Sequence, residues 1–348
     1  MTRTPPTSPA PSEVSMGAAL NRALLDAAAE DPDVVVYGED VGALGGVFRV
    51  TDGLSRELGA DRVFDSPLAE SGIIGTAIGM AMYGLRPVVE MQFDAFAYPA
   101  FEQFVSHLAK MRNRTRGTVS VPVVVRVPYG GGIGGVEHHS DSSEAYYTHT
   151  PGLRVVTPGT PADAYSMLRE AIACDDPVVF LEPKRRYWSK EAVELPVRTE
   201  PMERSVVRRT GSDATLVVYG PMVETALEAA AVAAEEGRSL EVVDLRQLTP
   251  WDDSVVTASV RRTGRAVVVH EASVFGGYGA EVAARVSERC FHYLEAPVLR
   301  VGGLDVPYPP PKLEHLHLPG VDRILAAVDR LQWESRWVAD ADGTGVDG

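Results

Sequence analysis

Cysteine is scarce in this sequence: Cys174 and Cys290 are the only two among 348 residues, and they form no CxxC pair. This argues against a disulfide framework and a zinc site, and it favours a reducing compartment, so we expect a cytoplasmic protein. Long apolar runs are missing as well. Neither a membrane-spanning segment nor the apolar core of a signal peptide is found.

Positive charge is in deficit, because 33 Lys and Arg stand against 48 Asp and Glu, a formal net charge of -15. An acidic surface repels polyanions, so we expect neither nucleic acid nor an anionic membrane as a partner. One short basic patch consists of Lys110, Arg112, Arg114 and Arg116. It is either a solvated helix end, which the helix dipole favours, or a contact for an acidic partner.

The chain is long enough for two α/β domains of ordinary size. Residues 1–12 and 338–348 are rich in small and polar residues and are expected to be disordered tails. Predicted strands and helices alternate through residues 13–188, and again through residues 213–337. The first helix is predicted to start after a cap at Ser15, and a later one to run to about Arg112. The charged, proline-containing residues 189–212 are typical of a linker. Such alternation predicts an α/β fold with mostly parallel sheets and right-handed crossovers.

One carboxylate, Glu70, stands in the first turn of a predicted helix. A short strand-like run precedes it, and Pro67 sets a turn between the two. The helix carries a glycine about once per turn among apolar residues, so we expect it to be buried and open to close approach by another backbone. Glu70 is then either a plain helix cap or a functional acid whose pKa is raised by apolar surroundings.

A second cluster follows another predicted strand. Gly130, Gly132 and Gly135 fit the GxGxxG spacing of dinucleotide-binding loops. The amphipathic helix that such a site needs does not follow, so we reject a nicotinamide site and interpret the glycines as a mobile loop that lets the next residues approach a ligand. Those residues include His138 and His139, which point opposite ways in an extended chain and are therefore unsuited to share one metal ion.

Several short motifs stand in order along the chain: DSPLAE at 65–70, GLRPVVEMQF at 84–93, HS at 139–140, PGL at 151–153, EPK at 182–184, DLR at 244–246 and HEA at 270–272. Together they resemble the β subunit of the thiamine-diphosphate-dependent decarboxylase component of 2-oxo acid dehydrogenase complexes. The resemblance covers about residues 15–335. It implies a thiamine-diphosphate-fold pyrimidine-binding domain followed by a transketolase C-terminal-like α/β domain.

The resemblance implies roles for particular side chains. The acid matching Glu70 hydrogen-bonds N1′ of the aminopyrimidine ring and so activates the cofactor. Phe96 stands where the family places an aromatic residue against that ring, although an aromatic residue near a strand end is more often core. The histidine matching His139 assists acyl transfer to a lipoyl group, a role that suits the near-neutral pKa of imidazole. Asp141 replaces the family's usual glutamine, and Glu39 lies in a loop that is either near the active centre or an ordinary polar loop.

The resemblance also implies ions. Many family members hold a structural potassium ion with backbone carbonyls, and the matching positions are Val123, Ala171, Ile172, Cys174 and Asp176. The alternative is an ordinary helix C-terminus. No Gly-Asp-Gly segment, the usual magnesium-diphosphate signature, occurs in the chain. We therefore expect Mg²⁺ and the diphosphate of thiamine diphosphate to be held mainly by an α subunit. The resemblance implies that the two kinds of subunit form an α2β2 heterotetramer.

We expect the β subunit of a branched-chain 2-oxo acid dehydrogenase. With its α subunit it would decarboxylate a small 2-oxo acid and pass the acyl group to a lipoyl group of the acyltransferase core. The nearest alternative is a pyruvate or acetoin dehydrogenase β subunit. A non-catalytic assembly subunit and a free-standing transketolase-like enzyme are the alternatives from other classes. His270 and Glu271, in the second domain, are expected to be structural.

Overall fold

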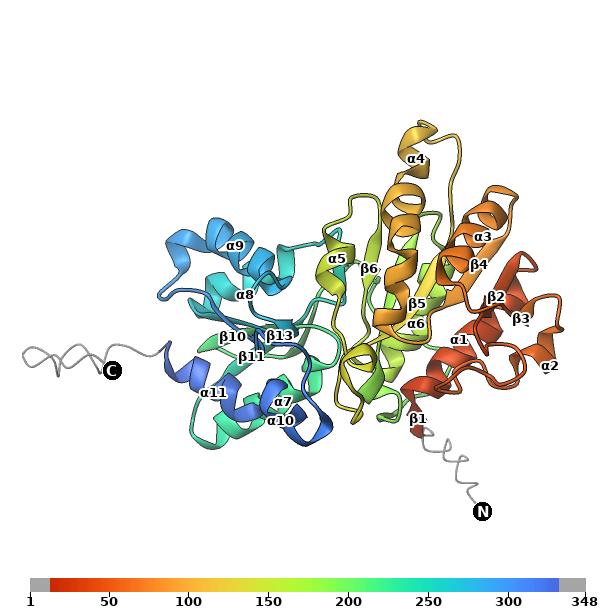
Figure 1. Cartoon of the computed structure of the whole chain (residues 1–348). Coiled ribbons are helices and arrows are strands. Elements are labelled where there is room, and N and C mark those ends of the chain that lie inside the picture. Colours follow the sequence, from red (N-terminus) through yellow and green to blue (C-terminus); the bar gives the residue numbers. More distant parts are fainter. Residues whose placement is uncertain (1–12, 332–348) are drawn as a thin grey trace, which may run out of the picture.

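The valine-rich runs of the sequence become the central strands of two sheets in the computed structural model, which describes residues 13–331 (Figure 1). The tails predicted at 1–12 and 338–348, and residues 332–337 of the predicted second domain, lie outside the described residues. Within the described part, no helix combines the length and the apolar character that crossing a membrane requires.

The first sheet contains seven strands in the order β12-β6-β7-β5-β4-β2-β3, and every pairing except that of β12 is parallel. The central strands are buried along their whole length, as expected for a parallel sheet covered on both faces. The strands are β2 (Val34–Gly38), β3 (Val63–Asp65), β4 (Arg86–Glu90), β5 (Val124–Tyr129), β6 (Arg154–Val156), β7 (Val178–Pro183) and β12 (Gln247–Thr249).

Helices cover this sheet. The first of them begins where predicted, because the Ser15 side chain accepts the Ala18 N–H and caps it. The α-helices are α1 (Met16–Glu30), α2 (Leu54–Leu58), α3 (Glu70–Met82), α4 (Met111–Arg114), α5 (Glu144–Thr148) and α6 (Pro161–Ala173). Tighter or wider turns form η1 (Asp94–Ala100), η2 (Gln103–His107), η3 (Leu108–Lys110), η4 (Glu137–His139) and η5 (Lys184–Arg186).

Two expectations about these helices need correction. The segment predicted as one helix to about Arg112 is broken into η1, η2, η3 and α4, and Pro99, which lacks an N–H, lies inside η1. Helix α3 buries only its apolar face in this chain, where Ile74 and Ala77 have no exposed surface. Its glycine face is exposed: a Cβ added at Gly79 would meet no atom within 4 Å. Intrachain packing therefore uses half of the helix.

The second sheet has five strands in the order β14-β13-β10-β11-β9, and only β9 is antiparallel to its neighbour. Its strands are β9 (Val206–Arg209), β10 (Ala214–Val218), β11 (Leu240–Asp244), β13 (Ala266–Ser273) and β14 (Leu299–Gly303). Its helices are α7 (Met222–Glu235), α8 (Ser254–Thr263), α9 (Gly279–Cys290), α10 (Glu314–His317), α11 (Val321–Asp329), with η6 (Phe291–Tyr293) and η7 (Pro311–Leu313).

Short strands tie the two halves together. In the segment predicted as a linker, β8 (Lys190–Ala192) pairs with β1 (Glu13–Ser15), and β9 joins the second sheet. Strand β12, which follows the second sheet's β11 in the chain, pairs antiparallel with β6 of the first sheet. A strand of three residues is too short to show an alternating pattern in the sequence. The predicted boundary at residue 212 stays a prediction.

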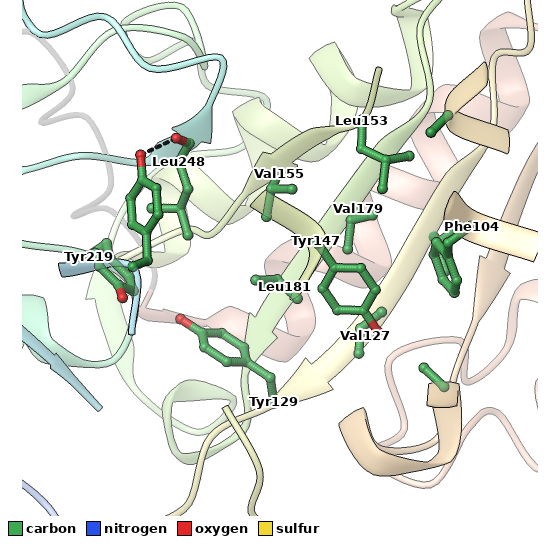
Figure 2. Close-up of a cluster of buried hydrophobic side chains, with 14 of the residues drawn as sticks. Phe104, Val127, Tyr129, Tyr147, Leu153, Val155, Val179, Leu181, Tyr219 and Leu248 are labelled. Atoms are coloured by element: carbon green, nitrogen blue, oxygen red, sulfur yellow. Dashed lines mark hydrogen bonds between the residues drawn. The ribbon is translucent and has the colours of Figure 1, made fainter. Parts of the chain in front are cut away.

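A continuous apolar cluster fills the junction (Figure 2). Tyr129 of β5 and Val155 of β6 belong to the same cluster as Tyr219 and Leu248, which come from the second half of the chain. The Tyr219 hydroxyl donates a 2.8 Å hydrogen bond to the buried Glu144 carboxylate. Burial of this apolar contact resists movement of one sheet relative to the other.

Candidate functional site

Four neighbouring parallel strands, β3, β2, β4 and β5, end at one edge of the first sheet. The loops that follow them carry the predicted residues: Glu39 after β2, Glu70 after β3, Phe96 after β4 and His139 after β5. The carboxyl ends of parallel strands are where open α/β sheets bind ligands. The topology therefore brings the four candidates to a single edge.

The two acids of this edge interact. Glu39 is 7% exposed, and its Oε1 is buried without a hydrogen-bond partner. Burial raises the pKa of Glu39, and the charges of Glu70 and Asp40 raise it further. Glu70 is the first residue of α3 and is half-buried. One of two neighbouring carboxyl groups is thus disposed to keep its proton, which is the arrangement that general acid chemistry uses.

The loop that carries Glu39 is fixed by hydrogen bonds to adjacent strand ends. Asp65 Oδ1, at the end of β3, accepts the Gly42 N–H at 2.6 Å. Asp40 Oδ2 accepts from Gln92 Nε2 at 2.9 Å. These bonds hold the backbone on either side of Glu39 against β3 and against the segment after β4.

The predicted aromatic residue and histidine are in contact. The His139 ring lies 5.3 Å from the Phe96 ring and 4.5 Å from the Phe93 ring, centroid to centroid, and both contacts are edge-on. His139 Nδ1 is buried and has no hydrogen-bond partner. The η1 segment, which carries Phe96, packs against both α3 and η4. Phe96 therefore lies on a segment that contacts both α3, the helix that begins with Glu70, and η4, the turn that ends with His139.

A buried network of charged side chains lies within the strands under this edge of the sheet. The Arg126 guanidinium on β5 donates to Glu182 of β7 at 2.7 and 2.9 Å and to Glu90 of β4 at 2.6 Å. Tyr187 adds a 2.5 Å hydrogen bond to Glu182. Burial raises the pKa of Glu90, although Arg126 opposes that shift. The network ties three adjacent strands together beneath the loops.

Lys184 is a residue that the sequence reasoning missed. It is fully buried, and its Nζ lies 5.7 Å from the centroid of the Phe93 ring that touches His139. Burial lowers its pKa to about 8, although Asp94 and Glu271 oppose the shift. The available signal was a charged residue directly after a buried strand, β7, at the same edge as the other candidates.

Asp141, which stands in place of the family's usual glutamine, has two structural contacts. Its carboxylate accepts from the Tyr98 hydroxyl at 2.9 Å, and its carbonyl oxygen accepts the Gly130 N–H at 2.7 Å. The second bond closes the loop between β5 and η4. In residues 13–331 no group of three His, Cys, Asp or Glu side chains could hold a metal ion.

The predicted potassium positions are bonded to other groups. Arg86 Nη1 donates to the carbonyl oxygens of Ile172 and Cys174, each at 3.2 Å, and Arg86 Nη2 lies 2.7 Å from an oxygen of Asp175. The Val123 carbonyl accepts the N–H of Val178 at 2.9 Å. A second cation beside the guanidinium would be repelled. An arginine already supplies a cation to the carbonyls of Ile172 and Cys174, which argues against a potassium ion beside those two oxygens. Potassium at the five positions stays a prediction.

We expect the thermal midpoint of the chain to be the same in potassium and sodium chloride at equal ionic strength. Replacing Arg86 with methionine should cost about 1.5–3 kcal/mol of unfolding free energy, the range for hydrogen bonds to a charged group. Arg56→Met on the exposed side of α2 is the matched control. Stabilisation of the unaltered chain by potassium alone would contradict this assignment, and calorimetry in the two salts measures it.

Several buried polar atoms at this edge of the sheet have no hydrogen-bond partner. Glu39 Oε1, Ser66 Oγ, His139 Nδ1 and Ser140 Oγ are all buried without a partner, and they lie in the loops after β2, β3 and β5. Buried polar groups are ordinarily hydrogen-bonded, so their lack of partners indicates a polar ligand or a second chain at this edge. An acid pair beside aromatic rings fits a planar, nitrogen-containing heterocycle.

The chain matches two known domains. Residues 12–189 match the transketolase pyrimidine-binding domain, and residues 203–324 match the transketolase C-terminal domain. A solved structure, a split-gene transketolase in an inactive beta4 tetramer, superposes with a TM-score of 0.75 at 27% identity and covers 91% of this chain and 98% of its own. The fold is thus of the transketolase class, a thiamine-diphosphate-dependent one, as the sequence predicted.

Among curated relatives, the pyruvate dehydrogenase E1 component subunit beta of Leifsonia xyli is 59% identical, with 90% of this chain and 93% of the relative covered. The 3-methyl-2-oxobutanoate dehydrogenase subunit beta of Mycobacterium tuberculosis is 57% identical over 91% and 92%. The 2-oxoisovalerate dehydrogenase subunit beta of Pseudomonas aeruginosa is 47% identical over 86% and 90%. The chain belongs to the family of 2-oxo acid dehydrogenase E1 β subunits, which work together with an α subunit.

Proposed function

We propose that this chain is the β subunit of a branched-chain 2-oxo acid dehydrogenase. The observation that supports this most directly is that an acid pair, Glu39 and Glu70, and an aromatic–histidine pair, Phe96 and His139, stand in loops at one edge of the sheet. With its α subunit the enzyme decarboxylates the 2-oxo acid. The acyl group then passes to one sulfur of a lipoyl disulfide, which is reduced as the acyl carbon is oxidised.

Thiamine diphosphate, when bound, supplies a nucleophilic carbon that takes up the oxo group and an electron sink for loss of CO₂. In this chain Glu70 holds a proton at the ring nitrogen of the pyrimidine. Glu39, whose pKa is raised by burial and by the charge of Glu70, adds a second carboxyl group beside Glu70 that is disposed to keep its own proton. The half-buried Phe96 ring supplies a flat apolar face for the heterocycle and helps to exclude water.

His139 serves the later half of the reaction. It stands at the end of η4, and its ring contacts Phe93 and Phe96 edge-on. The buried Nδ1 has no partner within the described chain, which leaves that atom for a ligand or for the second subunit. When the acyl carbon bonds one sulfur of the lipoyl disulfide, the other sulfur leaves as a thiolate, and an imidazole can supply the proton that this thiolate takes up.

Magnesium and the diphosphate are assigned to the α subunit. The chain has no Gly-Asp-Gly segment, and residues 13–331 hold no candidate metal cluster, so oxygen ligands for Mg²⁺ come from another chain. We assign the exposed glycine face of α3 to the contact between subunits of an α2β2 tetramer. The lipoyl group that accepts the acyl group is carried by the acyltransferase core of the complex.

The substrate is tested by reconstitution with the α subunit from the same source. We expect the ratio of kcat/KM for 3-methyl-2-oxobutanoate over that for pyruvate to exceed tenfold, since each added methyl group in an apolar pocket contributes about 10- to 200-fold. Release of CO₂ with each substrate measures this ratio. The name of the Leifsonia relative favours pyruvate as the second candidate, and a ratio below one would select it.

A further inference from the structure

The glycine loop between β5 and η4, residues 130–135, is bound by an acid from the other end of the chain. Glu314, the first residue of α10, accepts the Gly132 N–H through Oε1 at 2.7 Å and the Gly134 N–H through Oε2 at 3.3 Å. Both oxygens of one carboxylate are therefore directed at the backbone of a loop about 180 residues earlier in the sequence. The sequence predicted a mobile loop, but two of its N–H groups are hydrogen-bonded to this carboxylate.

Two more side chains of the second half contact the same loop. The Tyr308 hydroxyl lies 3.2 Å from the Gly132 nitrogen and donates to Glu314 Oε1 at 2.6 Å. Glu271, at the end of β13, accepts the Gly131 N–H and pairs with Arg185 at 3.1 Å. Glu271 is 3% exposed. The N–H groups of Gly131, Gly132 and Gly134 are thus bound by side chains from the second half of the chain.

The sequence of the loop is adapted to this contact. Gly132 has φ +82° and Gly134 has φ +70°, a conformation that L side chains rarely adopt. A Cβ at Gly131 would lie 1.8 Å from the Tyr308 hydroxyl. Backbone N–H groups that converge in such a turn form an anion-binding nest. Here the anion is a carboxylate of the same chain, which explains why a GxGxxG pattern occurs without a nucleotide site.

The other end of the loop leads directly to His139. Gly130 N donates to the Asp141 carbonyl at 2.7 Å, and His139 N donates to the Val136 carbonyl at 2.8 Å. The segment from Gly130 to Asp141 is therefore a loop whose two ends are hydrogen-bonded to each other, and His139 lies near the second end. Fixing the glycines on one side restricts where the η4 turn, and with it the His139 ring, comes to lie against Phe93 and Phe96.

We propose that Glu314 and Tyr308, together with Glu271, are positioning residues for His139: the second domain clamps the glycine loop and thereby sets the histidine for acyl transfer. This rests on the proposed function for the transfer step. The position of His139 then depends on residues that lie outside the sheet edge where the candidate catalytic residues gather. It also gives the second domain a part in the reaction beyond assembly.

The clamp is tested first without any activity, by amide hydrogen exchange on the full chain. Glu314→Ala should speed exchange in peptides covering residues 130–140 about tenfold, because a hydrogen bond to a charged group is lost. Glu314→Gln, which keeps an acceptor oxygen, should restore part of the protection. Glu288→Ala, at an exposed position of α9, is the matched control and should leave the loop unchanged. Unchanged exchange in Glu314→Ala would overturn the clamp.

The positioning role is tested by splitting the reaction. In the reconstituted pair, Glu314→Ala should lower reductive acylation of a lipoyl domain about 10- to 100-fold, the cost of a misplaced catalytic group. Decarboxylation measured with ferricyanide as electron acceptor should stay within twofold. Added to His139→Ala, the Glu314→Ala change should lower acylation no further, since both act through one histidine.

Multiplying losses in the double variant, or an equal fall in both half-reactions, would overturn the positioning role. If the unaltered pair shows no 2-oxo acid activity, the proposed function fails, and the exchange experiment still decides whether Glu314 holds the loop. The thermal midpoint of each variant is measured in parallel. A midpoint within 2 °C of that of the unaltered chain separates positioning from unfolding.

Discussion

Replacing Glu70 with glutamine is expected to lower decarboxylation by the assembled enzyme about 10²- to 10⁴-fold, the range for removing a general acid or base. Glutamine has nearly the same shape but holds no exchangeable carboxyl proton. Glu70 begins α3 at the end of β3, and its charge contributes to the raised pKa of Glu39. The rate of CO₂ release by the reconstituted pair at saturating thiamine diphosphate is the measurement.

The competing interpretation of Glu70 is that of a helix cap, and it predicts a different result. Loss of an acid from a first turn costs about 0.3–1 kcal/mol of stability and leaves the rate unchanged. Glu281→Gln is the control, because Glu281 is an exposed acid in the first turn of α9. If Glu70→Gln and Glu281→Gln behave alike in both rate and thermal midpoint, Glu70 is a cap, and a non-catalytic assembly subunit becomes the better account.

The sequence predicted the local parts of this edge well. Alternating strands and helices predicted parallel strands, and a parallel sheet gathers its strand ends at one edge. That Glu70 and His139 serve one site was implied by the family resemblance alone. The capped start of α1 at Ser15 was also predicted, because a cap depends on residues within one turn. Whether these residues act in catalysis stays a prediction until the variants are measured.

Contacts between distant segments could not be predicted in the same way. No periodic pattern relates Glu314 to Gly132, or Arg86 to the Ile172 carbonyl, because each contact depends on how two separate elements pack. The GxGxxG spacing was rejected as a nucleotide site because no amphipathic helix was predicted after it, and in the structure the short turn η4 follows it. What the sequence did not reveal is the carboxylate that takes the phosphate's place.

The buried network under the edge gives the largest expected effect on stability. Replacing Arg126 with methionine should lower the unfolding free energy by about 3–5 kcal/mol, because it leaves two buried carboxylates without their cation. Glu90 is 4% exposed and Glu182 is fully buried, so water cannot compensate for the loss. Urea unfolding measures the change. Arg22→Met, which breaks only an exposed pair with Asp26, is the control and should cost less than 1 kcal/mol.

The pH dependence of that loss distinguishes charge from packing. Burial already raises the pKa of Glu90, and removing Arg126 takes away a charge that lowers it. A carboxyl whose pKa is higher in the folded state than in the unfolded state binds more protons when folded, so its folded state loses stability as pH rises through that window. The deficit of Arg126→Met should therefore be smaller at pH 5 than at pH 8. An equal deficit at both values would mean that the methionine fits the space poorly and that the two acids carry no uncompensated charge.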